Sequence, residues 1–347
     1  MKNTLAVVSA FLALAAMPAL AQDMPKTKLT VVGSISSLAP YKEFEVPFWT
    51  VHLAEKSNGA VTAEIKGFNE MGLKGPEVLR LMSTGALEIG ATVLAYLAAD
   101  DPANEAVDIA GLITSVDEAR KATEASKAMY EKLFRARGVK LLGFGTYPAQ
   151  VLYCNVEIKG LADVRGKKVR VAGRSQSELI AALGGTPVTM SFGEVVPALQ
   201  NKTVDCGITG TLSGNFAKWN EVSTHLLAIP LSWGQIAYAV NLKAWDKLDP
   251  RVRALIEKEM PTLEKGIWDA AAYHTEQGIA CNGGRDDCKI GTKGKMIVIQ
   301  PSAADRALLK QTVEGMLIPK WADRCSAECV AEFNATIGKV VGVTAKK

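Results

Sequence analysis

Short apolar stretches alternate with amphipathic stretches along the first part of the chain. Apolar runs at 28–35, 60–68 and 87–97 have strand-like lengths and predict strands. Between them, residues 44–59 and 75–85 carry apolar positions at helical spacing, and each segment ends in glycine. Strands that alternate with helices predict an α/β fold with mostly parallel sheets.

The same alternation continues to about residue 280. The predicted helices are 115–138, 193–203 and one very long helix at 249–280. The predicted extended segments are 139–155, 204–210 and parts of 225–248. Proline disrupts the hydrogen-bond ladder of a helix, so we expect Pro261 to bend the long one.

The first residues have the composition of an export signal. Lys2 precedes an apolar run that ends near Ala16, and small residues follow at Ala19 and Ala21. We therefore predict a secretory signal peptide at 1–21 and an exported mature chain. No later run approaches the roughly 18 apolar residues needed to cross a bilayer, so we expect no membrane insertion.

Composition narrows the possible functions. The 347 residues are 48% hydrophobic, which is enough for a large core and favours two domains over one. The formal charge is only +4, and the basic residues are spread along the chain, which argues against a nucleic-acid partner. The three histidines are dispersed and no C-x-x-C is present, so we expect neither a metal nor a cofactor.

Six cysteines in an exported chain predict disulfides. Two pairs of cysteines each bracket a short segment, which leaves two cysteines distant in sequence. The predicted pairs are Cys281 with Cys288, Cys325 with Cys329 and, by elimination, Cys154 with Cys206.

A candidate anion site lies in segment 166–180, where a strand gives way to a helix. The valines on either side of Arg170 should face the core, so Arg170 should point the other way. Ser175 and Glu178 form an S-x-x-E capping box that should start the helix. An arginine beside a helix N-terminus can hold a carboxylate with two N–H donors, aided by the helix dipole. The alternative is an ordinary surface arginine paired with a nearby Asp or Glu.

Segment 160–210 resembles the central signature of the periplasmic solute-binding proteins of tripartite ATP-independent periplasmic (TRAP) transporters. The family pattern is approximately D-L-x-G-x-K-[IV]-R-V, then L-G-x-x-P-V, then E-x-x-x-A-L-Q-x-G-x-V-D-G. The matching residues are Asp163, Gly166, Lys168, Arg170, Leu183, Gly184, Pro187, Val188, Glu194, Ala198, Leu199, Gln200, Val204 and Asp205. Residues 77–91 and 241–258 also match, so the resemblance covers nearly the whole mature chain.

The resemblance implies a type II periplasmic-binding-protein-like fold, in which two hinged lobes close on a small organic acid without catalysis. Lobe I would comprise 27–149 and about 242–280, and lobe II 150–241 and about 281–347. The long helix would span both lobes. The protein would act in the periplasm and deliver its ligand to the membrane subunits of a TRAP transporter.

The resemblance also places ligand-binding residues. Arg170 falls where the family has a carboxylate-binding arginine, Thr209 where many members have a ligand-contacting asparagine, and Gln150 where some have a second arginine. Cys206 replaces a glycine of the pattern. These departures remove charge or polarity from the expected pocket, so we expect a monocarboxylate that is small, hydroxylated or aromatic.

Four further residues are candidates for ligand contact. Trp233 could form a flat apolar wall, although plain core packing is the alternative reading of a tryptophan. Ser36, Asn69 and Glu70 follow the first two predicted strands, and their alternative is an ordinary polar turn. Arg174 should be an exposed secondary cation.

Two other functions are alternatives for an exported α/β protein. A periplasmic hydrolase is disfavoured because the chain has neither G-x-S-x-G nor H-E-x-x-H. Residues 143–148 also do not complete a dinucleotide fingerprint. A binding protein of an ATP-driven importer would share the hinged architecture and differ in its partner.

Overall fold

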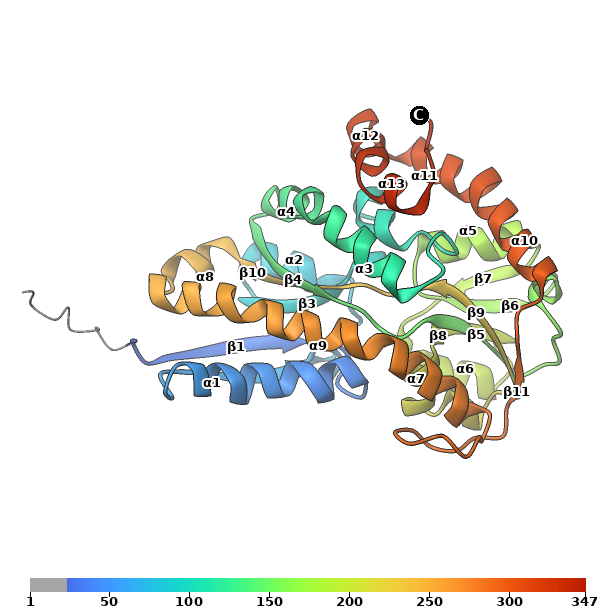
Figure 1. Ribbon diagram of the computed structural model, residues 1–347, viewed down its shortest axis with the longest axis horizontal. Helices are drawn as coiled ribbons and strands as arrows, with labels where there is room; N and C mark the ends of the chain where they lie inside the picture. The colour runs from blue at the N-terminus through green and yellow to red at the C-terminus, as the bar shows by residue number, and fades with distance from the viewer. Residues whose placement is uncertain (1–23) are drawn as a thin grey trace, which may run out of the picture.

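The computed structural model describes residues 24–347, and the predicted signal peptide lies outside these described residues. Two sheets lie side by side along the long axis of the molecule, each covered by helices (Figure 1). This is the two-lobed α/β architecture that the sequence predicted.

The bounds of the elements are as follows. The strands are β1 (Thr27–Gly33), β2 (Val61–Gly67), β3 (Ile89–Val93), β4 (Val139–Gly145), β5 (Gln150–Cys154), β6 (Lys168–Val171), β7 (Thr186–Thr189), β8 (Cys206–Gly210), β9 (His225–Ser232), β10 (Ile236–Asn241) and β11 (Ile297–Ile299). The α-helices are α1 (Leu53–Lys56), α2 (Glu77–Thr84), α3 (Val116–Ala125), α4 (Lys127–Arg135), α5 (Arg174–Ala182), α6 (Val195–Gln200), α7 (Thr211–Phe216), α8 (Leu242–Lys247), α9 (Pro250–Asn282), α10 (Ala303–Thr312), α11 (Ile318–Arg324), α12 (Ala327–Ala335) and α13 (Ile337–Val341). Shorter 3₁₀ and π turns lie between them: η1 (Pro40–Glu45), η2 (Phe48–His52), η3 (Phe68–Met71), η4 (Leu94–Leu97), η5 (Pro102–Asp108), η6 (Leu161–Val164), η7 (Phe192–Glu194), η8 (Trp219–Glu221) and η9 (Val313–Leu317).

Both sheets are mixed and mostly parallel, as predicted, because in each sheet a single strand runs against all the others. The first has the strand order β2-β1-β3-β10-β4, and the second has the order β11-β9-β5-β8-β6-β7. In the first sheet β1, β2 and β3 pair in parallel, while β10 pairs antiparallel with both β3 and β4. In the second, β5 is antiparallel to both β8 and β9. The antiparallel pairs arise because the chain crosses between the sheets instead of returning through a helix.

Two short segments and one helix connect the two sheets. The chain crosses from β4 to β5 through residues 146–149 and returns from β9 to β10 through residues 233–235. Helix α9 packs on β4 of the first sheet and on α7 beside the second (Figure 1). Gly278 allows this second contact, because a Cβ there would lie 2.2 Å from the backbone nitrogen of Leu212.

Two segments depart from the predicted lobe division. The prediction assigned 150–241 to lobe II, but β10 completes the first sheet, so the crossing at 233–235 marks the boundary. The C-terminal helices were also assigned to lobe II, yet α13 packs on α3 of the first lobe while α10 packs on η6 of the second. The rest of the division stays a prediction.

Some predicted elements are interrupted. The predicted strand at 87–97 ends at Val93 and continues as the 3₁₀ turn η4. The predicted helix at 115–138 divides at Ser126, whose hydroxyl donates to the carbonyls of Ala122 and Thr123. The predicted long helix is α9, which continues through Pro261.

Three disulfides confirm the predicted pairing. They join Cys154 to Cys206, Cys281 to Cys288 and Cys325 to Cys329. The first pair links directly opposite positions of β5 and β8, at the centre of the second sheet. Within residues 24–347, no helix is both long enough and apolar enough to span a membrane.

Candidate functional site

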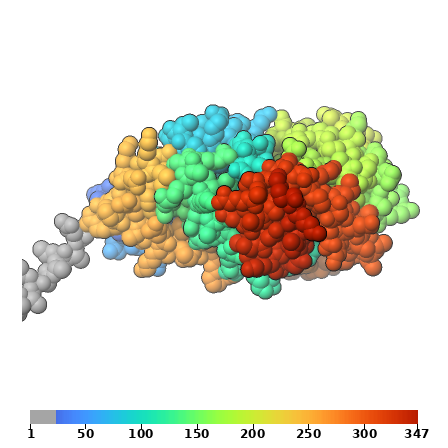
Figure 2. Space-filling model, turned by 90° about the horizontal axis from the view of Figure 1, so that it is seen from above, coloured from blue at the N-terminus to red at the C-terminus, as the bar shows by residue number. Residues whose placement is uncertain are grey.

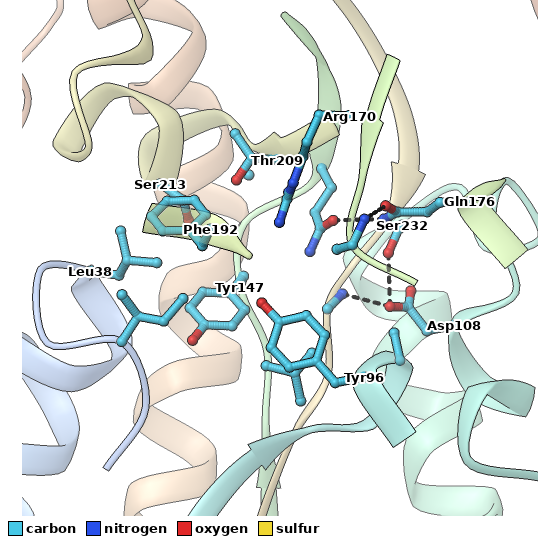
Figure 3. A pocket seen from close by; sticks show the side chains of 17 residues that line it. Leu38, Tyr96, Asp108, Tyr147, Arg170, Gln176, Phe192, Thr209, Ser213 and Ser232 are labelled. Atoms are coloured by element: carbon cyan, nitrogen blue, oxygen red, sulfur yellow. Dashed lines mark hydrogen bonds between the residues drawn. The ribbon is translucent and has the colours of Figure 1, made fainter. Parts of the chain in front are cut away.

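A cavity lies between the two lobes, close to both crossing segments. It contains about 430 Å³ of space not filled by atoms, part of it open to solvent. Its lining residues come from both sheets and their loops: Ile35, Leu38, Val93, Ala95, Tyr96, Asp108, Tyr147, Gln150, Arg170, Ala172, Gln176, Phe192, Thr209, Gly210, Ser213, Ser232 and Gly234 (Figure 3). The sequence-predicted residues Arg170, Gln150 and Thr209 are therefore brought together here.

Arg170 is the cationic side chain of this cavity. It lies on β6 beside Gly207 of β8, and Thr209 follows two residues later on the same face of β8. Its Nε and Nη2 donate to the carbonyl of Met190 at 3.1 and 3.0 Å, and its Nη1 donates to the carbonyl of Ile208 at 2.9 Å. These bonds use one N–H of each nitrogen, so each terminal nitrogen keeps one more N–H for another partner.

The guanidinium of Arg170 is buried, and among residues 24–347 it forms no ion pair within 4 Å. Its exposed fraction is only 2%. Burial lowers the pKa of Arg170, while the nearby Tyr96 and the carboxylate of Glu194 act in the opposite direction. The indole of Trp219 lies 5.8 Å from the guanidinium carbon, where Gly207 leaves room for the ring. A buried cation of this kind favours an anionic ligand.

The predicted capping box at the start of α5 is wrong. The helix begins at Arg174 after the N-cap residue Gly173, and no side chain caps it. Instead, Glu105 of the first lobe reaches the first turn, where its Oε2 accepts a hydrogen bond from the backbone N–H of Ser175 at 2.9 Å. The N-terminus of α5 therefore already holds a carboxylate of the protein, which leaves Arg170 as the candidate group for binding an anion in the cavity.

The orientation of Gln150 follows from a directed chain of hydrogen bonds. The backbone N–H of Ala172 donates to Oε1 of Gln176 at 2.9 Å, which leaves Nε2 of Gln176 as the donor to Oε1 of Gln150 at 3.0 Å. The amide Nε2 of Gln150 therefore points the other way, toward Gly234, where a Cβ would lie 2.3 Å from it. Gln150 thus offers a neutral N–H donor on the side of the cavity wall formed by Gly234.

Asp108 fixes the crossing segment behind the cavity. Its carboxylate accepts hydrogen bonds from the hydroxyl of Ser232 and the backbone N–H of Gly234, at 2.8 and 2.9 Å (Figure 3). It also accepts one from the backbone N–H of Trp233 at 2.8 Å. Burial raises the pKa of Asp108 to about 6, although all three hydrogen bonds favour the ionised form. The residue therefore belongs to the scaffold of the cavity wall.

Trp233 does not form the predicted wall. It is absent from the cavity lining, its indole N–H donates to the carbonyl of Ile113 at 3.1 Å, and its exposed fraction is 3%. The crossing segment buries it in the core. Tyr96, Tyr147 and Phe192 provide the aromatic surface of the cavity instead.

The three loop candidates of the first lobe have local structural roles. The Asn69 Oδ1 accepts from the backbone N–H of Ser36 at 2.9 Å, and its Nδ2 donates to the Ser36 hydroxyl. Glu70 accepts from the backbone N–H of Gly67 at 2.7 Å and starts the turn η3. None of these residues lines the cavity.

Sequence reasoning missed Tyr96, Asp108, Gln176 and Phe192. Tyr96 lay inside a predicted strand, but η4 turns it into the cavity, where its hydroxyl points toward Arg170 (Figure 3). Gln176 follows Arg170 by six residues in the first turn of α5, and that spacing alone could have indicated a shared cavity. Among residues 24–347, no group of His, Cys, Asp and Glu could hold a metal ion.

The family of the chain follows from comparison with known proteins. The family model for bacterial extracellular solute-binding proteins, family 7, matches residues 36–316. A C4-dicarboxylate-binding periplasmic protein of Rhodobacter capsulatus is 34% identical over 218 residues, which are 60% of this chain and 63% of that protein. The alignment thus spans less than two thirds of that relative's length.

Two solved structures have the same fold. An extracytoplasmic solute receptor of Bordetella pertussis that binds pyroglutamic acid has a TM-score of 0.78 and 20% identity, covering 89% of this chain and 99% of the receptor. A TRAP periplasmic solute-binding protein of Desulfovibrio salexigens with bound orotic acid has a TM-score of 0.79 and 20% identity, covering 90% and 99%. With the match of the family model to most of the chain, we conclude that this protein belongs to the bacterial extracellular solute-binding proteins of family 7.

Proposed function

We propose that this protein is an extracytoplasmic receptor that binds one organic carboxylate between its lobes and delivers it to the membrane subunits of a TRAP transporter. The observation that carries the proposal is the buried guanidinium of Arg170, which faces the cavity and forms no ion pair within 4 Å among residues 24–347. Desolvating a cation is costly, and a carboxylate that accepts two N–H bonds offsets that cost.

The remaining polar groups of the cavity favour a ligand with a single negative charge. Arg170 is the one cation among the lining residues, and the hydroxyls of Tyr96, Thr209 and Ser213 are neutral. Gln150 stands where a second arginine would favour a dianion, and its Oε1 accepts from Gln176, so its Nε2 would be the donor to a neutral oxygen of the ligand. We therefore propose a monocarboxylate that also carries a carbonyl or hydroxyl oxygen.

The ligands of the two similar structures agree with this class, whereas the relative from Rhodobacter capsulatus is named for C4-dicarboxylates, so succinate is the decisive comparison. Pyroglutamic acid and orotic acid each combine one carboxylate with ring carbonyl groups. These proteins share only 20% identity with this chain, so their ligands support the chemical class and do not identify the compound.

Binding would close the lobes around the ligand. Tyr96 belongs to the first lobe and Arg170 to the second, so a carboxylate held between them joins both. Bending at the crossing segments would open the cavity, and closure would exclude water and strengthen the arginine–carboxylate contact. The proposed role needs no catalytic step.

Calorimetric titration with a panel of acids tests the proposal. Pyroglutamate, orotate and lactate represent the proposed class, benzoate is the monocarboxylate without a further oxygen, and succinate is the dianionic comparison. We expect at least one monocarboxylate to bind more tightly than succinate and to be recovered chemically unchanged. Tighter binding of succinate would contradict the proposed ligand class, and conversion of the acid to a product would contradict the receptor function.

A further inference from the structure

The C-terminal helices form a strap that crosses from one lobe to the other. We use this name for residues 303–341, which contain α10, η9 and α11 to α13. The strap packs on η6 and α5 of the second lobe and on α3 of the first. Figure 2 shows its red surface lying over the junction between the green and yellow-green parts of the chain. The indole N–H of Trp321 attaches it to the carbonyl of Pro102 at 2.9 Å.

Arg324 connects the strap to both lobes. Its guanidinium forms ion pairs with Glu105 of η5 in the first lobe and with Glu178 of α5 in the second. The side chains of Arg324, Glu105 and Glu178 are 17%, 0% and 16% exposed, so solvent screens these pairs far less than surface ion pairs. The adjacent disulfide between Cys325 and Cys329 constrains the chain where it leaves α11.

The contacts of Glu105 lead from Arg324 to the cavity. One carboxylate oxygen of Glu105 binds Arg324, and the other accepts the backbone N–H of Ser175. The next residue of α5 is Gln176, which lines the cavity and orients Gln150. A displacement of the first turn of α5 would therefore displace the amide donor of the ligand site.

Arg324 also compensates the negative charges of Glu105 and Glu178, which repel each other. Burial raises the pKa of Glu105, Glu178 acts in the same direction, and Arg324 opposes both. Without Arg324, the fully buried carboxylate of Glu105 would lose its countercharge and retain the repulsion of Glu178.

We propose that Arg324 is a positioning residue of the ligand site, which holds Glu105 on the first turn of α5 and thereby keeps the two lobes and Gln150 in their binding geometry. The part of this proposal that concerns the ligand rests on the proposed receptor function. The contact between the lobes does not depend on it.

Amide hydrogen exchange of the full mature chain without ligand tests the contact between the lobes. Peptides covering residues 173–178 are compared in the wild type, in Arg324→Gln and in the Arg324→Gln/Glu105→Gln double variant. The double variant removes the buried charge but keeps an amide oxygen that can accept the Ser175 N–H. Arg306→Gln, which changes an exposed arginine of α10 in the same strap, is the matched control.

We expect exchange in peptides 173–178 to become at least roughly tenfold faster in Arg324→Gln, because a buried ion pair has been broken. The double variant should recover much of the protection, and Arg306→Gln should behave as the wild type. Unchanged exchange at 173–178, or an equal acceleration across both sheets, would overturn the proposal. In the second case Arg324 would only stabilise the fold.

Titration of the same variants with pyroglutamate, orotate and succinate tests the effect on the ligand. We expect Arg324→Gln to weaken the best-bound acid by about tenfold, mainly through faster dissociation, and the double variant to restore affinity. Native affinity in Arg324→Gln would refute the positioning role. If the wild type bound none of these acids, the proposed ligand class would fail, while the exchange experiment would still decide whether Arg324 pins the lobes.

Discussion

Replacing Arg170 should abolish most ligand binding while leaving a folded protein. Arg170→Met keeps most of the side-chain volume and removes the guanidinium, so a bound carboxylate would be buried without a countercharge. Breaking a buried charge pair costs about 3–5 kcal/mol, which corresponds to a roughly 150- to 5,000-fold weaker affinity. Arg170→Lys retains the charge but loses the two-pronged geometry, so its loss should be smaller, at about ten- to hundredfold.

The structure also predicts a cost in stability for Arg170→Met. The carbonyls of Met190 and Ile208 would each lose a donor, at about 1–3 kcal/mol for each group that remains unsatisfied. Affinity is therefore measured by calorimetry well below the unfolding midpoint, after circular dichroism has confirmed the fold.

Arg174→Ala is the control for charge near the cavity. Arg174 is 55% exposed and forms an i,i+4 pair with Glu178, which contributes little to stability. We expect this variant to bind within about twofold of the wild type. Native affinity of Arg170→Met for a carboxylate ligand would refute the assignment of the site.

Three further changes test separate parts of the cavity. Gln150→Arg should shift preference from monocarboxylates toward succinate in competition titrations, and an unchanged ligand profile would show that Gln150 does not contact the ligand. Tyr96→Phe should weaken the best-bound acid by about tenfold, because the hydroxyl facing Arg170 is lost, and unchanged affinity would exclude that contact. The pKa of Asp108 is raised from 3.8 to about 6, so the folded state binds more protons than the unfolded state. The stabilising contribution of Asp108 should then be fully present below pH 3.8 and be lost as the pH rises through 6. Urea unfolding should show the wild type gaining stability relative to Asp108→Asn, on the order of 2 kcal/mol, as the pH falls from 7 to 4, and a constant difference would contradict the raised pKa.

The strands and disulfides that depend on residues close together in the sequence were predicted correctly for the most part. Alternating apolar positions identified most strands, and the short segments between cysteines identified two disulfides. The crossing segments were harder to read, because β9 and β10 are consecutive apolar strands that pair in different sheets. The composition of β9 and β10 does not indicate which sheet each strand joins. For this reason the predicted lobe boundary and the predicted role of Trp233 were wrong.

The sequence predicted the cavity residue whose position depends on a single strand. It did not predict the residues that reach the cavity or α5 through tertiary contacts. Arg170 stands out as a cation between two core-facing valines. Glu105, by contrast, is 70 residues from Ser175, whose N–H it binds, so the true partner of the α5 N-terminus could not be read from the local S-x-x-E pattern. Tyr96 lies in an apolar run that was predicted as one strand. In the structure β3 ends at Val93, and Tyr96 belongs to the following turn η4.

The crystal structure of the protein with its bound acid tests the central claim most directly. Protein purified under native conditions or supplied with the best-bound acid of the panel would be used. We predict a carboxylate between the lobes, with its oxygens about 2.7–3.1 Å from the two terminal nitrogens of Arg170. A ligand without negative charge, or an acid bound elsewhere while Arg170 faces only protein atoms, would contradict the account.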